Sequence, residues 1–352
     1  MNNIQGIAYA EFHVENLPKA TALLVDGFGF TAARPEGVTA LASTAGTDET
    51  PETAGTAGLE RIGLRAGGVS LVLSSAADPE HPAAAFVRKH GDGVAVIAVA
   101  CLDPEAAYAH AVEHGAVPVS PADLTIAGFG DSALRFVAEA PADGAGANGA
   151  DGPPLQMEAI DHVAVCVPAG TLASTVDFCE QVLELRRIFG DYIKVGTQGM
   201  DSIVMQSGSG AVTFTLLEPD ASGQPGQIND FLDGHGGMGV QHLALLTGDI
   251  ADGIRNLGER GVEFLKTPAS YYDVLEDRVG PTGIPLETLR ELNILVDQDH
   301  GGQLYQIFTR SVHARRTYFF ELIDRRGAST FGTANITALY EAIARQEATS
   351  AR

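Results

Sequence analysis

The chain has 352 residues, 45% of them hydrophobic and 19% charged, which is typical of a globular protein with a sizeable core and about two domains. Its 45 acidic residues outnumber the 22 basic ones and give a formal net charge of −23. Such a field repels a phosphate backbone and argues against nucleic acid as a partner. No apolar run reaches the roughly 18 residues of a membrane span, and no basic and then apolar leader opens the sequence. We therefore expect a cytoplasmic protein with no membrane partner, and a homo-oligomer stays open.

The cysteines Cys101, Cys166 and Cys179 are odd in number and include no Cys-x-x-Cys pair. This arrangement fits neither a disulfide framework nor a structural zinc site. We expect a reducing compartment, which would also suit a ferrous ion.

The first half of the chain contains two strand–helix patterns. In "GIAYAEFHVENLPKATALLVDGFGF" (6–30) an alternating strand leads through a turn into a helix-like stretch. The same order recurs in "GDGVAVIAVACLDPEAAYAHAVEHGAVPV" (91–119), where Gly115 is placed to end the helix.

The composition then changes, and the patterns repeat. Residues 139–156 are mostly Gly, Ala, Pro and Asp with almost nothing to bury, which predicts a flexible linker. Beyond it, residues 159–185 echo the first pattern and residues 236–265 echo the second, with Gly261 at the helix end. Each half therefore holds two units of strand, helix and several strands.

Two of the ten histidines stand inside strand-like segments of the second half, His162 in "IDHVAV" and His242 in "GVQHLAL". They are 242 − 162 = 80 residues apart, about one repeat unit, so they can meet across a pseudo-two-fold axis. Tyr9 and Val96 hold the equivalent positions of the first half. The other histidines lie in turns or charged stretches and are expected at the solvated surface, with His13 partly exposed: His81, His90, His110, His114, His235, His300 and His313.

Glu321 in "TYFFELI" is the third candidate, 321 − 242 = 79 residues further on. A carboxylate inside an apolar strand is rarely buried without a partner. Two imidazoles and one carboxylate form a facial triad, which favours non-haem Fe(II), with Mn(II) as a competitor. The alternative is that each group merely satisfies a core position, but three such groups at repeat spacing, absent from the first half, favour a metal site.

Four motifs carry a resemblance to a known family: "GVQHLAL", "GVEFLKTPASYYD", "LRELNILVDQDHGGQLYQIFT" and "FFELIDRRGASTFGTANITALYEAI". They resemble the 4-hydroxyphenylpyruvate dioxygenase family of the vicinal oxygen chelate superfamily, over nearly the whole chain and most strongly over 156–345. The resemblance implies an α+β, glyoxalase-like fold of tandem βαβββ units that form two half-open β-barrel domains. We expect a metal-free domain at 1–143, a linker at 144–156 and a catalytic domain at 157–352.

The resemblance also implies the chemistry of the site. His162, His242 and Glu321 fall on the family's iron ligands, the same three that the spacing selects. The cofactor would be Fe(II), and the small-molecule partners would be 4-hydroxyphenylpyruvate and O2. Because this substrate supplies its own keto acid, no 2-oxoglutarate is implied.

Two products are compatible with that chemistry, homogentisate from attack on the ring and 4-hydroxymandelate from attack on the benzylic carbon. Ring-hydroxylating relatives carry Phe-Pro-Ile-Asn-Glu-Pro where this sequence has "FTLLEP" (214–219). Thr215 replaces the proline and Leu217 the asparagine. A leucine cannot make the hydrogen bonds of an amide, and orientation decides which carbon an oxidant attacks. We therefore expect 4-hydroxymandelate, with homogentisate as the alternative.

The same motifs imply further pocket residues. Gln306 and Phe308 alternate onto one face of a strand. Phe308 and Phe331 would sandwich the substrate ring, and Gln306 would orient the acid or a ligand water. Ser202 would hydrogen-bond near the keto acid, and Phe319 would line the pocket. Core packing is the alternative for each aromatic residue.

The segment from Asn335, "NITALYEAIARQEA", spaces its apolar residues as one helical stripe. In the family such a helix closes the pocket, and "FGTAN" before it would be the hinge. Two rival functions stay open. An extradiol ring-cleaving dioxygenase shares the ligand set but needs acid–base residues, and no third pocket histidine is evident. A non-catalytic small-molecule-binding module would lack the metal ligands, as the first half does.

Overall fold

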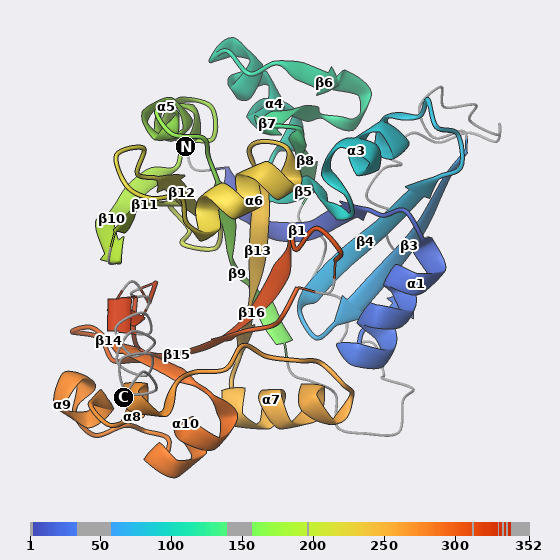
Figure 1. The fold of residues 1–352 in the computed structure, drawn as a ribbon. Coiled ribbons are helices and arrows are strands. Elements are labelled where there is room, and N and C mark those ends of the chain that lie inside the picture. The colour runs from blue at the N-terminus through green and yellow to red at the C-terminus, as the bar shows by residue number, and fades with distance from the viewer. Residues whose placement is uncertain are drawn as a thin grey trace.

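The structure is a computed structural model that describes residues 3–33, 58–138, 157–195, 197–311, 313–329, 331–332, 334–335 and 337–338. Two eight-stranded sheets with matching strand orders form its framework (Figure 1). The first sheet has the order β2-β3-β4-β1-β5-β8-β7-β6 and the second the order β10-β11-β12-β9-β13-β16-β15-β14.

The first sheet and its helices are built from residues 4–138. Its strands are β1 (Ile4–His13), β2 (Thr31–Ala33), β3 (Leu59–Ala66), β4 (Val69–Ala76), β5 (Gly93–Cys101), β6 (Pro118–Ser120), β7 (Thr125–Phe129) and β8 (Ser132–Ala138). Its helical segments are α1 (Leu17–Ala22), η1 (Leu23–Gly27), α3 (Pro82–His90), α4 (Pro104–Glu113) and η2 (Pro121–Asp123).

The second sheet and its helices are built from residues 157–326. Its strands are β9 (Met157–Cys166), β10 (Arg186–Val195), β11 (Gln198–Gln206), β12 (Thr213–Pro219), β13 (Gly239–Thr247), β14 (Leu295–Gln298), β15 (Gln303–Phe308) and β16 (Phe319–Arg326). Its helices are α5 (Leu172–Gln181), α6 (Gln227–His235), α7 (Ile250–Glu259), α8 (Ala269–Tyr272), α9 (Leu275–Val279) and α10 (Leu286–Leu292).

This order of elements is four successive βαβββ units, two in each sheet, so the predicted fold class is confirmed. In each sheet the first strands of the two units, β1 with β5 and β9 with β13, pair antiparallel at the centre. The predicted linker at 144–156 lies outside the described residues, and the division into 1–143 and 157–352 stays a prediction. Most of the predicted C-terminal helix also lies outside the described residues.

The helices begin and end where the sequence provides caps. Asp103 and Asp249 accept hydrogen bonds from backbone N–H groups in the first turns of α4 and α7. Gly115 and Gly261 follow these two helices in the left-handed conformation (φ 97° and 88°), as predicted. Helix α7 buries the stripe Ile250, Ile254 and Leu257 against the core and lies below the second sheet in Figure 1. No helix in the described part of the chain is both long and apolar enough to span a membrane.

The expected surface position is wrong for His90 and His235, which are only 1% and 2% exposed. Each closes its helix, α3 or α6, and the two helix ends meet where the halves of the chain touch. Their rings stack 4.2 Å apart, and His90 Nδ1 donates a hydrogen bond to the His235 carbonyl oxygen (2.7 Å). A helix end that looks solvated in the sequence is thus buried by a partner distant in the chain.

Candidate metal centre

Three adjacent strands at the centre of the second sheet bring the predicted triad together. His162 on β9 and Glu321 on β16 both lie opposite Ala244 of β13, one on each side. His242 stands two residues before Ala244, so all three side chains project from one face. Ala244 is fully buried and has no side chain beyond Cβ, which leaves the space between the ligand groups open.

The donor atoms fit one divalent ion. His162 Nε2 lies 3.3 Å and His242 Nε2 lies 3.4 Å from Glu321 Oε2, and one ligand atom from each residue falls within 4.8 Å of the others. Neighbouring ligands on an octahedral ion with bonds of about 2.1 Å are roughly 3 Å apart. The three buried groups therefore need only small adjustments to hold a metal, and two imidazoles with one carboxylate form the ligand set of non-haem iron sites.

The charges of the triad are coupled. Burial opposes ionisation of Glu321, but its close contacts with the His162 and His242 rings outweigh burial and lower the pKa of the carboxyl group. Burial also disfavours the His162 cation, yet Asp161 and Glu321 together raise the pKa of this imidazole to about 9. Burial lowers the pKa of His242. A metal ion at His162 Nε2 would therefore compete with a proton for this nitrogen.

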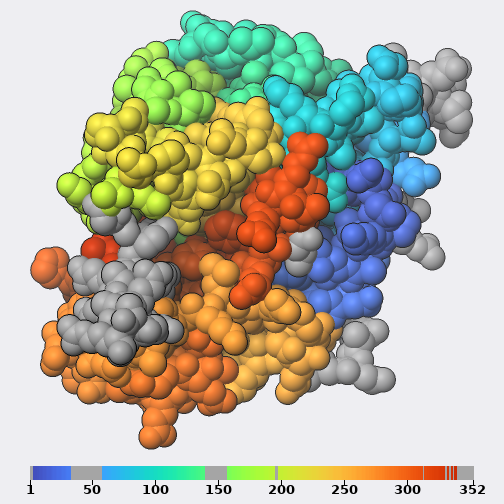
Figure 2. All heavy atoms as spheres, in the orientation of Figure 1, coloured from blue at the N-terminus to red at the C-terminus, as the bar shows by residue number. Residues whose placement is uncertain are grey.

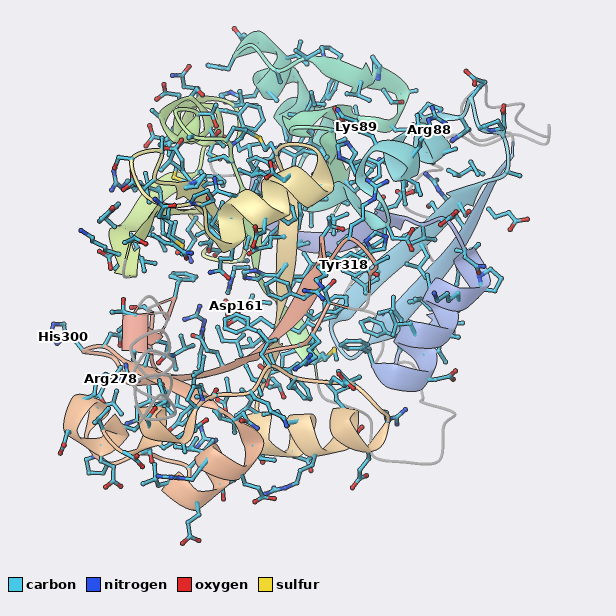
Figure 3. All side chains as sticks on the ribbon, in the orientation of Figure 1. Arg88, Lys89, Asp161, Arg278, His300 and Tyr318 are labelled. Atoms are coloured by element: carbon cyan, nitrogen blue, oxygen red, sulfur yellow. The ribbon has the colours of Figure 1, made fainter. Side chains whose placement is uncertain are left out.

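Each imidazole has a partner on its second nitrogen. His162 Nδ1 donates to Asp161 Oδ1 (2.8 Å), and His242 Nδ1 donates to Gln241 Oε1 (3.2 Å). Arg325 and His162 hold the pKa of Asp161 well below its usual range, against the effect of burial. A carboxylate at Nδ1 keeps the proton there and leaves the lone pair of Nε2 for a metal. Figure 3 labels Asp161 in the middle of the molecule, between the upper and lower parts of the second half.

The predicted aromatic residues gather around the two histidines. The Phe319 ring stacks on His242 at 4.9 Å. The Phe308 ring lies edge to face with the His242 ring at 6.1 Å and with the Phe319 ring at 6.0 Å. The Phe331 ring contacts His162 edge to face at 5.6 Å. Figure 2 shows the red-orange atoms of the last strands recessed between the yellow residues above and the orange residues below.

The predicted polar and apolar pocket residues lie on the same face as the triad. Thr215 pairs with Ala164 in the parallel register, two residues from His162. Ser202 pairs with Leu217 across β11 and β12, in line with that face. Leu217 packs in an apolar cluster with Ala164, Cys166 and Met200.

Two of these polar groups are left without a protein partner. Thr215 Oγ1 and Gln306 Oε1 are buried and form no hydrogen bond to the described residues. An unsatisfied buried polar group costs about 1–3 kcal/mol, and native structures usually supply a partner. Both atoms therefore point to a polar ligand or water in the pocket.

The equivalent location of the first sheet holds charges of a different kind. Its strand register places Tyr9, Val96 and Arg135 where the second sheet has His162, His242 and Glu321. Arg135 donates to the Tyr9 hydroxyl (2.9 Å) and pairs with buried Glu11 (3.4 Å). An arginine cannot bind a metal ion, so this sheet has replaced the ligand set by an internal ion pair.

A separate surface depression of about 790 Å³ lies between α1 and residues 260–265 and 310–316. None of the predicted site residues lines it. Among the described residues, the group of side chains that could hold a metal ion lies at the triad and not in this depression.

Sequence reasoning missed Asp161, Arg325 and Arg135. The alternation of β16 could have indicated Arg325, which is four residues from Glu321 and so on the same face. The pairings of Asp161 and Arg135 depend on strand register, which the sequence alone does not give.

The family model of the "Glyoxalase/Bleomycin resistance protein/Dioxygenase superfamily" matches residues 6–145 and 159–277. The 4-hydroxyphenylpyruvate dioxygenase of Aspergillus fumigatus is 34% identical over 294 residues, covering 75% of this chain and 73% of the relative. This chain belongs to the 4-hydroxyphenylpyruvate dioxygenase family. The dioxygenase of Coccidioides posadasii is 29% identical over 390 residues, covering 99% and 94% of the two chains.

Among solved structures, a triple mutant of 4-hydroxymandelate synthase from Streptomyces coelicolor is similar over the whole length. It shares 40% sequence identity and superimposes with a TM-score of 0.80, covering 98% of this chain and 99% of the other. The family predicted from the four motifs is thus confirmed, and the family consists of non-haem iron enzymes.

Proposed function

We propose that this chain is an Fe(II)-dependent enzyme that oxidises 4-hydroxyphenylpyruvate with O2 to 4-hydroxymandelate and CO2. One oxygen atom enters the carboxylate that decarboxylation leaves behind, and the other enters the benzylic carbon. The similarity to 4-hydroxymandelate synthase supports the reaction class. The observation that carries the choice of product is the place of Leu217 and Thr215 on the triad face of β12.

His162, His242 and Glu321 would hold the iron. When bound there, the iron would supply redox chemistry and open coordination positions for the keto acid and oxygen. The residues of the chain bind and orient. Thr215 and Gln306 offer unpaired polar atoms to the substrate or to a water, and Ser202 lies on the strand next to that of Thr215. The rings of Phe308, Phe319 and Phe331 enclose the reacting groups and exclude water.

Product choice would follow from the polarity of the β12 face. An asparagine at position 217 would offer an amide donor and acceptor to the substrate or its oxygenated forms. Leu217 instead extends the apolar cluster with Met200 and Cys166. The aromatic head of the substrate then has no amide to hold its ring toward the oxidant, and the benzylic carbon is nearer to attack.

The second candidate is homogentisate formation. It is favoured by the names of the relatives from Aspergillus fumigatus and Coccidioides posadasii, both 4-hydroxyphenylpyruvate dioxygenases. Both candidates use the same substrate, metal and release of CO2, so only the product separates them.

The test is product analysis of the wild type and of the double variant Thr215→Pro, Leu217→Asn. We expect 4-hydroxymandelate from the wild type and a larger homogentisate fraction from the variant. Full conversion is not expected, because Ser202, Phe308 and Phe331 share the orientation of the substrate. A product ratio that does not change in the variant would remove these two positions from the explanation.

A further inference from the structure

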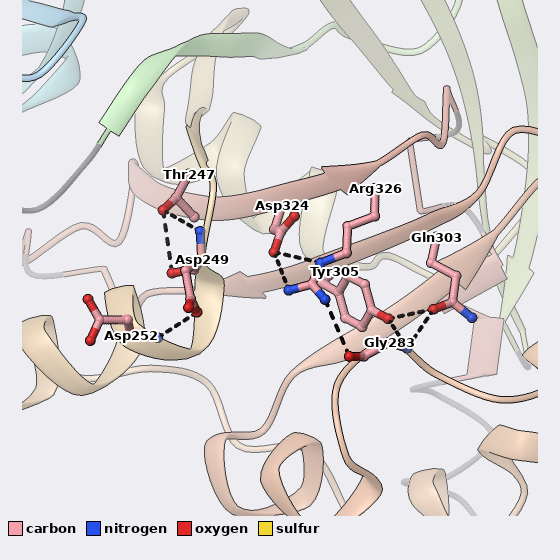
Figure 4. A network of polar contacts seen from close by, with 8 residues as sticks. All are labelled: Thr247, Asp249, Asp252, Gly283, Gln303, Tyr305, Asp324 and Arg326. Atoms are coloured by element: carbon pink, nitrogen blue, oxygen red, sulfur yellow. Dashed lines mark hydrogen bonds and ion pairs between the residues drawn. The ribbon is translucent and has the colours of Figure 1, made fainter.

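Strand β16 ends in two consecutive arginines that face opposite ways. Arg325 shares the face of Glu321, because residues two and four apart on a strand project to the same side. Arg326 projects to the other face, where it pairs with Asp324 (3.0 Å) and lies over the Tyr305 ring (Figure 4). Arg325 therefore lies on the face of the metal site, and Arg326 is a neighbouring arginine on the opposite face that can serve as a control.

Arg325 binds the Asp161 carboxylate through two hydrogen bonds. Nε donates to Oδ2 (2.6 Å) and Nη2 donates to Oδ1 (2.9 Å). The Asp161 and Arg325 side chains are only 8% and 18% exposed, so solvent screens this fork-shaped contact weakly. The same Oδ1 accepts from His162 Nδ1 (2.8 Å). Arg325 thus fixes the carboxylate that orients a metal ligand.

Arg325 also contacts the segment that carries Phe331. Its guanidinium lies 4.7 Å from the centre of the Phe331 ring, a favourable cation–π arrangement, and Nη1 donates to the Ala328 carbonyl oxygen (3.3 Å). Phe331 in turn meets the His162 ring at 5.6 Å. The Arg325 side chain therefore contacts both Phe331 and Asp161, the residue that supports His162.

We propose that Arg325 is a positioning residue that couples the placement of Phe331 over the pocket to the orientation of His162. The guanidinium is a rigid group that lies over the Phe331 ring while its N–H groups hold Asp161. Displacing Phe331 removes the ring contact and loosens the hold on Asp161, and the His162 ring loses its fixed direction. By reciprocity, a metal ion that fixes His162 favours Phe331 in its place over the pocket.

Among the described residues, no such connection reaches the other imidazole. His242 is supported by the neutral amide of Gln241 at 3.2 Å, and the described contacts of Gln241 include no charged group. The coupling is therefore specific to one ligand of the triad. The inference rests on the proposed function, because it takes His162 to be a metal ligand.

The test is titration of purified, metal-free protein with Co(II), followed by its visible absorption. We expect Arg325→Met and Asp161→Asn each to weaken Co(II) binding by about 10- to 100-fold, the usual effect of losing a partner that orients a ligand. Arg325→Lys keeps the charge but cannot donate two parallel hydrogen bonds to Asp161. Its Co(II) affinity should therefore lie between those of wild type and Arg325→Met. The control Arg326→Met should bind Co(II) within about twofold of wild type. Circular dichroism and thermal melting of each variant confirm folding.

The coupling itself is tested by a double-mutant cycle. Phe331→Leu should weaken Co(II) binding in the wild-type background and alter the absorption spectrum. In the Asp161→Asn background the same change should have a smaller effect, because only the direct contact of the Phe331 ring with His162 remains. Additive effects of Phe331→Leu and Asp161→Asn would overturn the coupling, even if Arg325→Met fails to fold.

The outcomes separate this inference from the proposed function. A wild-type protein that binds no stoichiometric Co(II) contradicts the metal site itself. A wild type that binds Co(II) and an Arg325→Met variant that binds it equally well overturn the role of Arg325 alone.

Discussion

Gly332 provides a sharp test of how the pocket is closed, because the backbone there leaves no room for a side chain. Its φ is +73°, and a Cβ at this position would lie 2.7 Å from Cδ and 2.8 Å from Nε2 of Gln306. Gln306 is buried, so its amide cannot move aside without disturbing neighbours. The variant Gly332→Ala therefore combines backbone strain with a clash at a predicted substrate contact.

The two effects can be separated with Gly280, which has a similar φ of +67° and nothing within 4 Å of its Cβ position. A backbone conformation with positive φ costs an alanine about 1–3 kcal/mol, partly offset by about 0.4–1 kcal/mol from a less flexible unfolded chain. Strain alone should cost each variant about 1 kcal/mol of unfolding free energy, a fall in Tm of about 2–4 °C, and the clash should add to this loss in Gly332→Ala. Only Gly332→Ala should also displace Gln306.

The assay is kcat/KM with 4-hydroxyphenylpyruvate at saturating Fe(II), together with thermal melting. We expect Gly332→Ala to lose about 100-fold in kcat/KM, as for a misplacement of about 1 Å, and Gly280→Ala to keep wild-type activity. Wild-type activity in both variants would refute the idea that the turn at 332 sets the position of Gln306. The same loss of activity in both variants would show that strain alone, and not the clash, accounts for the effect.

Three further predictions concern the triad, the co-substrate and the first sheet. Alanine at any one of the three triad positions should abolish turnover without unfolding the protein, and stoichiometric iron with normal activity in any such variant would contradict the site. Turnover should require Fe(II) and O2 but no 2-oxoglutarate, which oxygen-uptake assays with and without that acid will decide. Glu11→Gln should cost about 3 kcal/mol at neutral pH, the lower end for a broken buried pair, since the Arg61 partner is 36% exposed. Burial opposes ionisation of Glu11, but Arg61 and Arg135 outweigh it and lower its pKa; its stabilisation is therefore present above the unfolded-state pKa and lost as pH falls through the folded-state pKa. The Tm difference between wild type and variant should shrink in acid, and a constant difference down to pH 3 would contradict this.

The repeated strand–helix pattern made the fold predictable, because each unit contains the same alternation and the same helix ends. The echo of residues 6–30 in 159–185 and of 91–119 in 236–265 corresponds to the four βαβββ units. The register agrees with the sequence alignment of Tyr9 with His162 and of Val96 with His242. Such equivalences follow from periodicity along the chain alone.

Contacts between distant segments were less predictable. Nothing near His90 or His235 in the sequence indicates that their rings stack between α3 and α6. The hydrogen bonds from Arg325 to Asp161 join residues 164 positions apart. A strand pattern shows which face a residue occupies, but the neighbouring strand decides what it meets.

The product of the wild-type reaction tests the central claim most directly. Protein loaded anaerobically with Fe(II) is mixed with 4-hydroxyphenylpyruvate and O2, and the acids formed are separated by chromatography against both standards. With Leu217 and Thr215 on the triad face, 4-hydroxymandelate should be the dominant product, formed in step with CO2. Homogentisate as the dominant product would contradict this account and make the chain a ring-hydroxylating dioxygenase.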